Sequence, residues 1–385
     1  MEALELIEIL ERGEDSKHQF KANITNAESL AGDMVAFANT RGGMIIIGVD
    51  DNGKIANLTA DDIRRLNQLV ANTATNNVKN PINPITENVK VGDGLLMVVN
   101  IAEGTDKPYM DNNGVVWVKS GSDKRRVTSK EELRRLFQSS DLVHADEVPV
   151  AGTTENDIDL KYFKEFYQKQ YEENFEKSEI PLIQVLNNLN LAKNNNLNIA
   201  GLMLFGKQPE KYKSAFIIKA VAFVGNDPAG DKYRDSIDIK GKLGEQYRGA
   251  IDFLKRNLKY IQHEKGINTL GDLEIPPIAL EELIVNALIH RNYFINAPVR
   301  LFVFDDRIEI ISPGRLPNNL TIDNIKNGNS NIRNDIITSF ATKELPYRGI
   351  GTGIRRAIKN YPDIDFVNDS EGEKFVAIIK RPETK

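Results

Sequence analysis

Apolar positions along the chain follow two patterns, and each predicts its own kind of secondary structure. Helical spacing predicts helices at residues 1–12, 26–40, 60–73, 129–137, 159–174, 243–258, 279–290, 333–341 and 354–360. Short apolar runs predict strands at residues 44–49, 94–101, 114–119, 214–224, 299–304, 307–311 and 375–379. Because both kinds of element occur in each half of the chain, the pattern predicts an α+β protein.

A change in composition divides the chain into two predicted domains. Residues 1–140 hold one set of helices and strands, closed by the helix that follows Ser129. Residues 141–157 are acidic and rich in turn-forming residues, so we predict a linker there. Residues 158–385 form the second predicted domain, which begins with a helical portion. An Asn-rich run at 186–198 lies in that portion, and its recurring Leu residues predict helix and turn.

Composition narrows the class of protein. Of the 385 residues, 41% are hydrophobic and 27% are charged, as in ordinary globular proteins. No apolar run approaches the ~20 residues of a membrane helix, and the acidic start is unlike a secretory signal, so we expect a cytoplasmic protein without a membrane partner. There is no cysteine, which excludes disulfides and thiolate metal sites. The four histidines are too far apart for a local metal motif: His18, His144, His263 and His290.

One segment has a charge opposite to that of the whole chain, whose net charge is −5. Between Lys119 and Arg135, seven basic residues stand against three acidic ones. Basic groups in a loop beside a strand are suited to phosphate contacts, which makes four residues candidates for nucleic-acid binding. These are Lys119, Lys124, Arg125 and Arg126. The alternative is a solvated surface whose charges pair with one another.

Polar residues interrupt the apolar helix predicted at residues 279–290. Glu282, Asn286 and His290 are spaced by four residues and therefore share one face of this helix. An Asn amide oxygen can ligate Mg²⁺, and a nearby Glu can orient a water molecule. Asn286 is thus a candidate metal ligand and Glu282 a candidate catalytic residue. The alternative is that both lie at the solvent edge of the helix.

A glycine-rich loop, Gly349-Ile350-Gly351-Thr352-Gly353, precedes another predicted helix. Such a loop lets backbone N–H groups approach phosphates, and the helix N-terminus adds positive potential. No Gly-Lys-Thr follows, so it is not a Walker loop, and the lack of an obvious preceding strand argues against a dinucleotide fingerprint. The alternative interpretation is a flexible turn.

Three motifs together resemble the GHKL-like ATP-binding domain of predicted bacterial transcriptional regulators. The first is Asn-Ala-Leu-Ile-His-Arg-Asn-Tyr at 286–293, the second Ser-Pro-Gly-Arg-Leu-Pro at 312–317, and the third Gly-Thr-Gly-Ile-Arg-Arg at 351–356. The resemblance spans roughly residues 158–380. It implies a Bergerat-type α/β sandwich for the C-terminal domain, with ATP and Mg²⁺ as cofactors.

The same resemblance implies a role for each motif residue. Asn286 would hold Mg²⁺ and Glu282 would serve as the general base. The remaining residues would surround the nucleotide: His290, Ser312, Gly314, Gly349, Gly351, Thr352 and Gly353. In classical GHKL proteins an Asp reads the adenine amino group, whereas this chain has Ser312 at that position. A hydroxyl can also hydrogen-bond an amine, but more weakly than a carboxylate.

The N-terminal domain resembles the Schlafen-type AlbA-like domain. The residues that carry this resemblance are Glu-Asp-Ser-Lys-His-Gln-Phe-Lys at 14–21, the run from Phe37 to Gly53, and Val-Trp-Val-Lys-Ser-Gly-Ser at 116–122. The family is associated with nucleic-acid binding, and some members cleave RNA with a carboxylate cluster. Glu14 and an Asp at 50–51 match two of those acids. Gln19 replaces the third, and an amide cannot supply the charge that holds a catalytic metal.

These features lead to three hypotheses. The first is a regulatory protein that binds ATP and nucleic acid, DNA rather than RNA, and forms a homo-oligomer. In this hypothesis ATP changes the domain arrangement or the dimer, and so the affinity for nucleic acid. The second is a nucleotide-gated, Schlafen-like nuclease in a defence role, against which Gln19 argues. The third is a degenerate GHKL scaffold for dimerisation, which the Ser312 departure favours. As an enzyme, the chain would be at most a slow ATPase.

Overall fold

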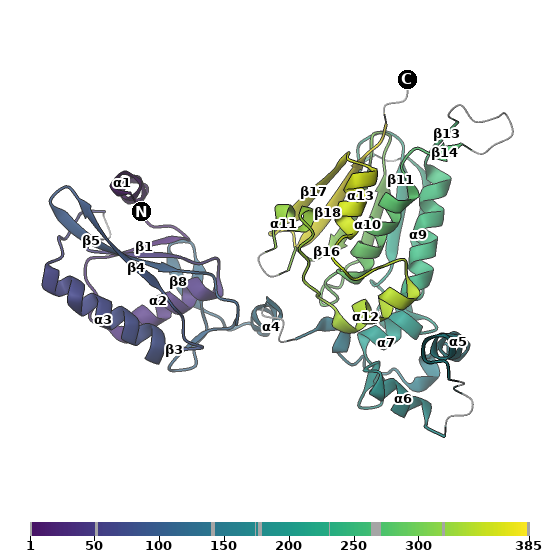
Figure 1. Cartoon of the computed structure of the whole chain (residues 1–385), viewed down its shortest axis with the longest axis horizontal. Helices are drawn as coiled ribbons and strands as arrows, with labels where there is room; N and C mark the ends of the chain where they lie inside the picture. The colour runs from purple at the N-terminus through teal and green to yellow at the C-terminus, as the bar shows by residue number, and fades with distance from the viewer. Residues whose placement is uncertain are drawn as a thin grey trace. The chain divides into compact units, whose positions relative to one another are not determined.

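The chain folds into two compact units, Met1–Val143 and His144–Lys385, each with its own core (Figure 1). The structure is a computed structural model that describes residues 2–50, 53–139, 143–173, 175, 179–230, 232–262, 271–317 and 320–382. Asp51, Asn52 and His263 lie outside the described residues, as do residues 141–142 of the predicted linker. Both units combine helices with strands, which confirms the predicted α+β class.

The N-terminal unit is built around a four-stranded sheet with the order β1-β2-β5-β4. Its strands are β1 His18–Lys21, β2 Gly43–Ile47, β4 Ile85–Val91 and β5 Gly94–Ile101. β1 and β2 run parallel, and the other neighbours are antiparallel. The apolar pattern predicts β2 and β5 but not β1 or β4, because β4 buries only Val89 and Val91.

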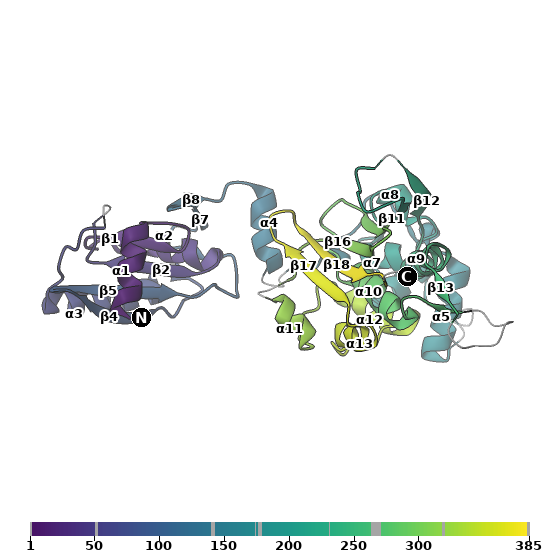
Figure 2. The ribbon, with the colours of Figure 1, turned by 90° about the horizontal axis from the view of Figure 1, so that it is seen from above.

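Different helices cover the two faces of this sheet. The helices of the unit are α1 Ala3–Arg12, α2 Ala27–Asn39, α3 Ala60–Asn76 and α4 Lys130–Ser139. Successive side chains of a strand point to opposite faces. Accordingly, Ile45 and Ile47 pack into the cluster formed with α2 and α3, whereas Ile46 packs with Leu6 and Ile9 of α1. Figure 2 shows α1 lying across the strands. The continuous apolar run of β2 therefore reflects burial on both faces.

A hairpin of β7 Trp117–Ser120 and β8 Asp123–Arg126 lies against α2. A second short pair is formed by β3 Val78–Lys79 and β6 Met110–Asp111. The buried Asn39 side chain joins these parts, since its amide donates to the carbonyls of Tyr109 and Trp117 and accepts from the Tyr109 N–H. Gly42 makes the turn from α2 to β2 at φ +68°, where a Cβ would lie 2.7 Å from the Ile101 carbonyl oxygen.

The C-terminal unit contains a six-stranded sheet with the order β12-β11-β15-β16-β18-β17. Its strands are β11 Ile218–Phe223, β12 Tyr233–Ile239, β15 Val299–Val303, β16 Arg307–Pro313, β17 Ile364–Asp369 and β18 Lys374–Lys380. Only β11 and β15 run parallel among these neighbours. Two short pairs stand apart from it: β9 Ala192–Lys193 with β10 Asn196–Leu197, and β13 Tyr260–Ile261 with β14 Asp272–Leu273.

Helices cover one face of this sheet, which gives the predicted α/β sandwich (Figure 1). The helices of the unit are α5 Leu160–Tyr171, α6 Leu182–Asn188, α7 Ile199–Phe205, α8 Pro209–Tyr212, α9 Leu243–Asn257, α10 Pro277–Ile289, α11 Ile322–Lys326, α12 Asp335–Glu344 and α13 Gly353–Asn360. α9 packs on β11 and β12, α10 packs on β16, and α13 packs on α10. Among the described residues, no helix has the length and apolar character that spanning a membrane requires.

The sequence predicts a linker at residues 141–157, but the described part of this stretch packs into the C-terminal unit. It forms two 3₁₀ turns, η1 Ala145–Glu147 and η2 Glu155–Asp157. Val150 donates its backbone N–H to the Leu197 carbonyl, and Val148 accepts from the Ile199 N–H. Asp146 is fully buried, and its carboxylate accepts the Ile337 N–H in the first turn of α12 at 2.9 Å. Asp146 thus supplies an acceptor to the first turn of α12 instead of facing solvent.

Burial raises the pKa of Asp146 to about 6, although the Ile337 N–H opposes this shift. A raised carboxyl pKa means that folding disfavours the charged form, so the stability contributed by Asp146 falls as pH rises from about 4 through 6. Relative to Asp146→Asn, the wild type should therefore gain about 2 kcal/mol of unfolding free energy between pH 7.5 and pH 4. Thermal unfolding of both proteins across this range tests it, because titrations common to both cancel. A gap that does not change with pH would contradict the prediction.

Candidate functional site

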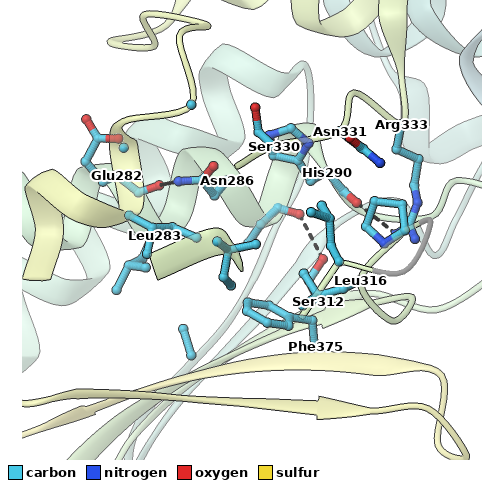
Figure 3. Close-up of a pocket in the computed structure, with 18 of the residues that line it drawn as sticks. Glu282, Leu283, Asn286, His290, Ser312, Leu316, Ser330, Asn331, Arg333 and Phe375 are labelled. Carbon is cyan, nitrogen blue, oxygen red and sulfur yellow. Dashed lines mark hydrogen bonds between the residues drawn. The ribbon is translucent and has the colours of Figure 1, made fainter. Parts of the chain in front are cut away.

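A single cavity of the C-terminal unit gathers the three sequence motifs. It lies between α10, the ends of β16 and β18, and the glycine-rich loop that leads into α13 (Figure 3). Its atom-free space is about 1010 Å³, a figure that includes the open mouth. Every residue that the sequence predicts for the cofactor site lines it: Glu282, Asn286, His290, Ser312, Gly314, Gly349, Gly351, Thr352 and Gly353. The fold brings them together because α13 packs on α10 and β16 pairs with β18.

One end of the cavity is polar. Glu282 is only 3% exposed, and its carboxylate forms an ion pair with Arg356 of α13. The alternative interpretation of the sequence placed Glu282 at the solvent edge of the helix, and its burial contradicts that placement. The Asn286 amide nitrogen donates to the Glu282 carbonyl oxygen at 2.6 Å. This bond fixes the orientation of the amide, whose other atom is the oxygen expected to ligate a metal.

The glycine-rich loop closes this polar end. Gly349 and Gly351 have φ values of +68° and +72°, which favour glycine. A Cβ on Gly351 would lie 2.7 Å from the Gly328 carbonyl oxygen. A Cβ on Gly353, the first residue of α13, would lie 2.3 Å from Glu282 Oε2. The positive φ values and the close approaches at Gly351 and Gly353 thus give this loop a specific conformation that favours glycine.

The other end of the cavity is largely apolar. Ile310, Leu316, Phe375 and Ala377 line it, and Figure 3 shows Ser312 beside Phe375 and Leu316. The Ser312 hydroxyl donates to the Ala287 carbonyl at 3.1 Å. Its only hydrogen is therefore used within the protein, and the oxygen is left with its lone pairs as an acceptor.

Gly314 and His290 lie on the side of the cavity near Arg333. A Cβ on Gly314 would lie 2.6 Å from the Cβ of Asn292, so the glycine is required by packing. His290 Nε2 lies 3.2 Å from the Tyr347 hydroxyl, and the His290 carbonyl accepts from Arg333. Burial, with the charge of Arg333, lowers the pKa of His290 to about 4. In the ligand-free protein these surroundings favour the neutral form of His290 at pH 7.

Four arginines also line the cavity, and sequence reasoning did not select them: Arg315, Arg333, Arg348 and Arg356. Their positive charge is suited to a phosphorylated ligand. Arg356 could have been found, because it lies three residues after Gly353 and so shares its face of the helix. The other three come from irregular segments, where no periodicity indicates which way a side chain points.

The predicted basic segment of the N-terminal unit has a different arrangement from the one expected. Residues 123–126 form strand β8 instead of a loop, so neighbouring side chains point to opposite sides. Lys124 Nζ lies 2.8 Å from the buried Asp33 carboxylate, and Arg125 forms two hydrogen bonds with Glu132 at 2.9 and 2.6 Å. The three consecutive basic residues therefore do not form one patch.

Arg126 and Lys119 have aromatic neighbours. The exposed Arg126 has its guanidinium 5.2 Å from the ring centre of Trp117, which Lys124 also approaches, at 5.4 Å. Lys119 Nζ lies 5.0 Å from the Phe37 ring centre, and burial lowers its pKa. Of the four predicted residues, Arg126 is the one most available to an external phosphate.

Glu14 and Gln19, which stand at positions of the Schlafen-type carboxylate cluster, form contacts within the protein. Glu14 Oε1 accepts the Phe20 N–H at 2.6 Å, and the Gln19 amide is buried with its oxygen 3.5 Å from Lys119 Nζ. Within the described residues, no group of three or more His, Asp or Glu side chains is arranged to hold a metal ion. Asp51 is not among the described residues.

Comparisons with known proteins agree with the two resemblances. Residues 14–128 match the family model described as "Schlafen, AlbA_2". Residues 296–375 match the HATPase-type model described as "Putative ATP-dependent DNA helicase recG C-terminal". No curated protein matches the chain.

Seventeen chains of solved structures match this chain. Two of them cover very different shares of it. One is a crystal structure of a protein from Corynebacterium diphtheriae, with 18% identity and a TM-score of 0.48, covering 99% of this chain and 80% of that one. The other is a solution structure of the N-terminal domain of a RecG-related protein from Nitrosomonas europaea, with 24% identity and a TM-score of 0.25, covering 34% of this chain and 96% of that one. The family matches confirm both resemblances: the chain carries a Schlafen AlbA_2 domain at its N-terminus and an ATPase-like, HATPase-type domain at its C-terminus.

Proposed function

We propose that this protein binds Mg²⁺-ATP in the C-terminal cavity and thereby regulates nucleic-acid binding by its N-terminal domain. The observation that carries the proposal is the division of the cavity, with Asn286, the glycine-rich loop and Arg356 at one end and apolar side chains at the other. A nucleoside triphosphate has the same division into a charged chain and a flat base. The HATPase-type family match supports a nucleotide as the ligand.

The phosphates would lie over the loop at 349–353, next to the N-terminus of α13. Thr352 is the N-cap residue of α13 and forms no side-chain capping bond, so its hydroxyl is available to a phosphate oxygen. Arg348 is exposed at the mouth of the cavity and adds positive charge. Each of these groups stabilises a polyanion by charge or by hydrogen bonding.

Asn286 has the right chemistry for Mg²⁺, which prefers oxygen ligands and keeps several waters when phosphates supply the rest. The hydrogen bond from the Asn286 amide nitrogen to the Glu282 carbonyl oxygen holds the Asn286 side chain in place. A bound Mg²⁺ would neutralise phosphate charge. Glu282 would orient a water toward the terminal phosphorus and accept its proton, while the bond to the bridging oxygen breaks and ADP leaves. Since Glu282 is paired with Arg356, we expect hydrolysis to be slow.

The base would occupy the apolar end, against Phe375 and Leu316. Ser312 can only accept a hydrogen bond there, because its hydrogen is donated to Ala287. An acceptor suits an exocyclic amino group, which adenine offers. Adenine is therefore the base that we propose, with Ser312 in place of the Asp of classical relatives.

Calorimetry on the full chain tests the nucleotide proposal. ATP should bind saturably below millimolar concentration, more tightly with Mg²⁺ than with EDTA, and should raise the unfolding temperature. If millimolar Mg²⁺-ATP gives neither binding heat nor a thermal shift, the site is not a nucleotide site. The dimerisation scaffold would then be the better interpretation of the C-terminal domain.

For the N-terminal domain we propose DNA as the partner, in a protein that controls transcription. The Schlafen AlbA_2 match supports nucleic-acid binding, and the DNA-helicase description of the second family model favours DNA over RNA. Lys119, Lys124, Arg125 and Arg126 are all residues of the β7–β8 hairpin, and Arg126 is the one most available to a phosphate. We propose that this hairpin contacts the phosphate backbone without reading bases.

Arg126→Ala should weaken binding to unrelated DNA sequences alike and reduce the salt slope of log K by about 1, as expected for one lost phosphate contact. Arg125→Ala is the matched control, since Arg125 is also exposed on β8 but is held by Glu132. Its effect should be clearly smaller. Fluorescence anisotropy at several salt concentrations measures both. Equal effects, or an unchanged slope in Arg126→Ala, would argue against the hairpin as the binding surface.

A further inference from the structure

The first turn of α13 encloses the Glu282 carboxylate. Arg356 Nη2 pairs with its Oε1, and a Cβ on Gly353 would lie only 2.3 Å from its Oε2. The Glu282 side chain is 4% exposed and that of Arg356 22% exposed. A carboxylate held in this way is not free to orient a water molecule, because its charge is already neutralised within the protein.

Arg356 also faces the cavity in which we propose that the nucleotide binds. It lines the cavity together with Asn286, Gly351 and Gly353. Its Nε is buried and has no hydrogen-bond partner within the described part of the chain. An unpaired buried donor is unfavourable, and a phosphate oxygen is the strongest acceptor that a nucleotide could offer it.

We propose that Arg356 distinguishes nucleoside triphosphates from diphosphates by exchanging its ion pair with Glu282 for one with the terminal phosphate. The inference rests on the proposed nucleotide site and deepens it. A terminal phosphate carries about −1.5 to −2 charges near pH 7, against the single charge of a carboxylate, so the exchange favours the phosphate. A diphosphate lacks this group at the corresponding position and leaves the Glu282–Arg356 pair intact.

The exchange also links specificity to chemistry. When Arg356 moves to the terminal phosphate, Glu282 becomes a free carboxylate beside Asn286, at the point where the attacking water would be oriented. Only a triphosphate thus releases the base that its own hydrolysis needs. Arg356 acts as a specificity-determining residue, and Glu282 is its competing partner in the nucleotide-free protein.

The test uses Glu282→Gln and the double variant Glu282→Gln/Arg356→Gln. Arg356→Gln alone leaves a buried, unpaired carboxylate and risks unfolding, whereas both chosen proteins are neutral at position 282. Arg355→Gln is the control, because Arg355 is exposed on the same helix and does not line the cavity. Calorimetry on the full chain measures the Kd of ADP and of a non-hydrolysable imido analogue of ATP, both with Mg²⁺.

The Kd ratio of ADP to the triphosphate analogue should rise in Glu282→Gln relative to wild type, because the competing carboxylate is gone. Compared with Glu282→Gln, the double variant should show a ratio that is lower on the order of tenfold or more. The ratio for Arg355→Gln should match that of the wild type. Equal ratios in Glu282→Gln and the double variant would overturn the inference while leaving the nucleotide site in place. If the wild type binds neither nucleotide, the proposed function and this inference both fail.

Discussion

Replacing Gly351 by valine is expected to abolish Mg²⁺-ATP binding while the fold persists. Gly351 has φ +72°, a region that a β-branched residue rarely adopts, and its Cβ would lie 2.7 Å from the Gly328 carbonyl oxygen. The substitution therefore changes the loop where the phosphates are proposed to lie. The strain is about 1–3 kcal/mol and falls in a half-exposed loop, so the hydrophobic core is not disturbed.

Gly225→Val is the matched control for this change. Gly225 also has a positive φ, +86°, but nothing lies within 4 Å of the position that its Cβ would take. Both variants carry the same kind of backbone strain, and only Gly351→Val alters the cavity. Calorimetry with Mg²⁺-ATP should give wild-type affinity for Gly225→Val and no binding for Gly351→Val. Retained affinity in a folded Gly351→Val protein would remove the loop from the proposed site.

Asn286→Ala is expected to reduce Mg²⁺-ATP affinity on the order of tenfold or more, which corresponds to about 1.4 kcal/mol. The substitution removes the proposed oxygen ligand, and alanine is the better helix former, so α10 should persist. The loss should largely disappear in EDTA, because without the metal the amide has no special role. Affinities measured by calorimetry with Mg²⁺ and with EDTA separate the two contributions.

Asn360→Ala controls for the loss of a helical asparagine. Its amide nitrogen donates to the Arg356 carbonyl four residues earlier at 2.8 Å, as that of Asn286 does to Glu282, but it does not line the cavity. It should leave nucleotide affinity unchanged. An Asn286→Ala protein with the same Mg²⁺ dependence as wild type would show that this residue is not a metal ligand.

For the candidate site, the sequence predicted which residues lie in the cavity but not what they contact. Glu282, Asn286 and His290 share a face because helical spacing alone requires it. The pairing of Glu282 with Arg356, 74 positions later in the chain, depends on the packing of α13 on α10. The neutrality of His290 likewise follows from burial beside Arg333, which no local pattern encodes.

The basic segment illustrates the same limit in the N-terminal domain. Its excess of basic residues is a property of the sequence, and it predicted a positively charged surface. Whether Lys124 and Arg125 are available to a ligand depends on Asp33 and Glu132, and on the strand that turns the two side chains to opposite sides. Charge counted along a chain therefore overestimates the charge that a surface presents.

For the fold, the sequence by itself determined the long periodic helices, the strands with continuous apolar runs and the two domain types. Those elements bury their own apolar residues, so the signal lies within each segment. Only the tertiary structure decided the edge strands β12 and β17, whose backbone bonds come from β11 and β18; the side chains of β12 are largely exposed, and β17 buries only Ile364 and Phe366. It also decided that residues 145–157 pack as structure instead of linking domains, since the buried Asp146 finds its partner in α12. A local pattern reports what a segment can bury, whereas a hydrogen bond or an ion pair between distant segments exists only once the chain has folded.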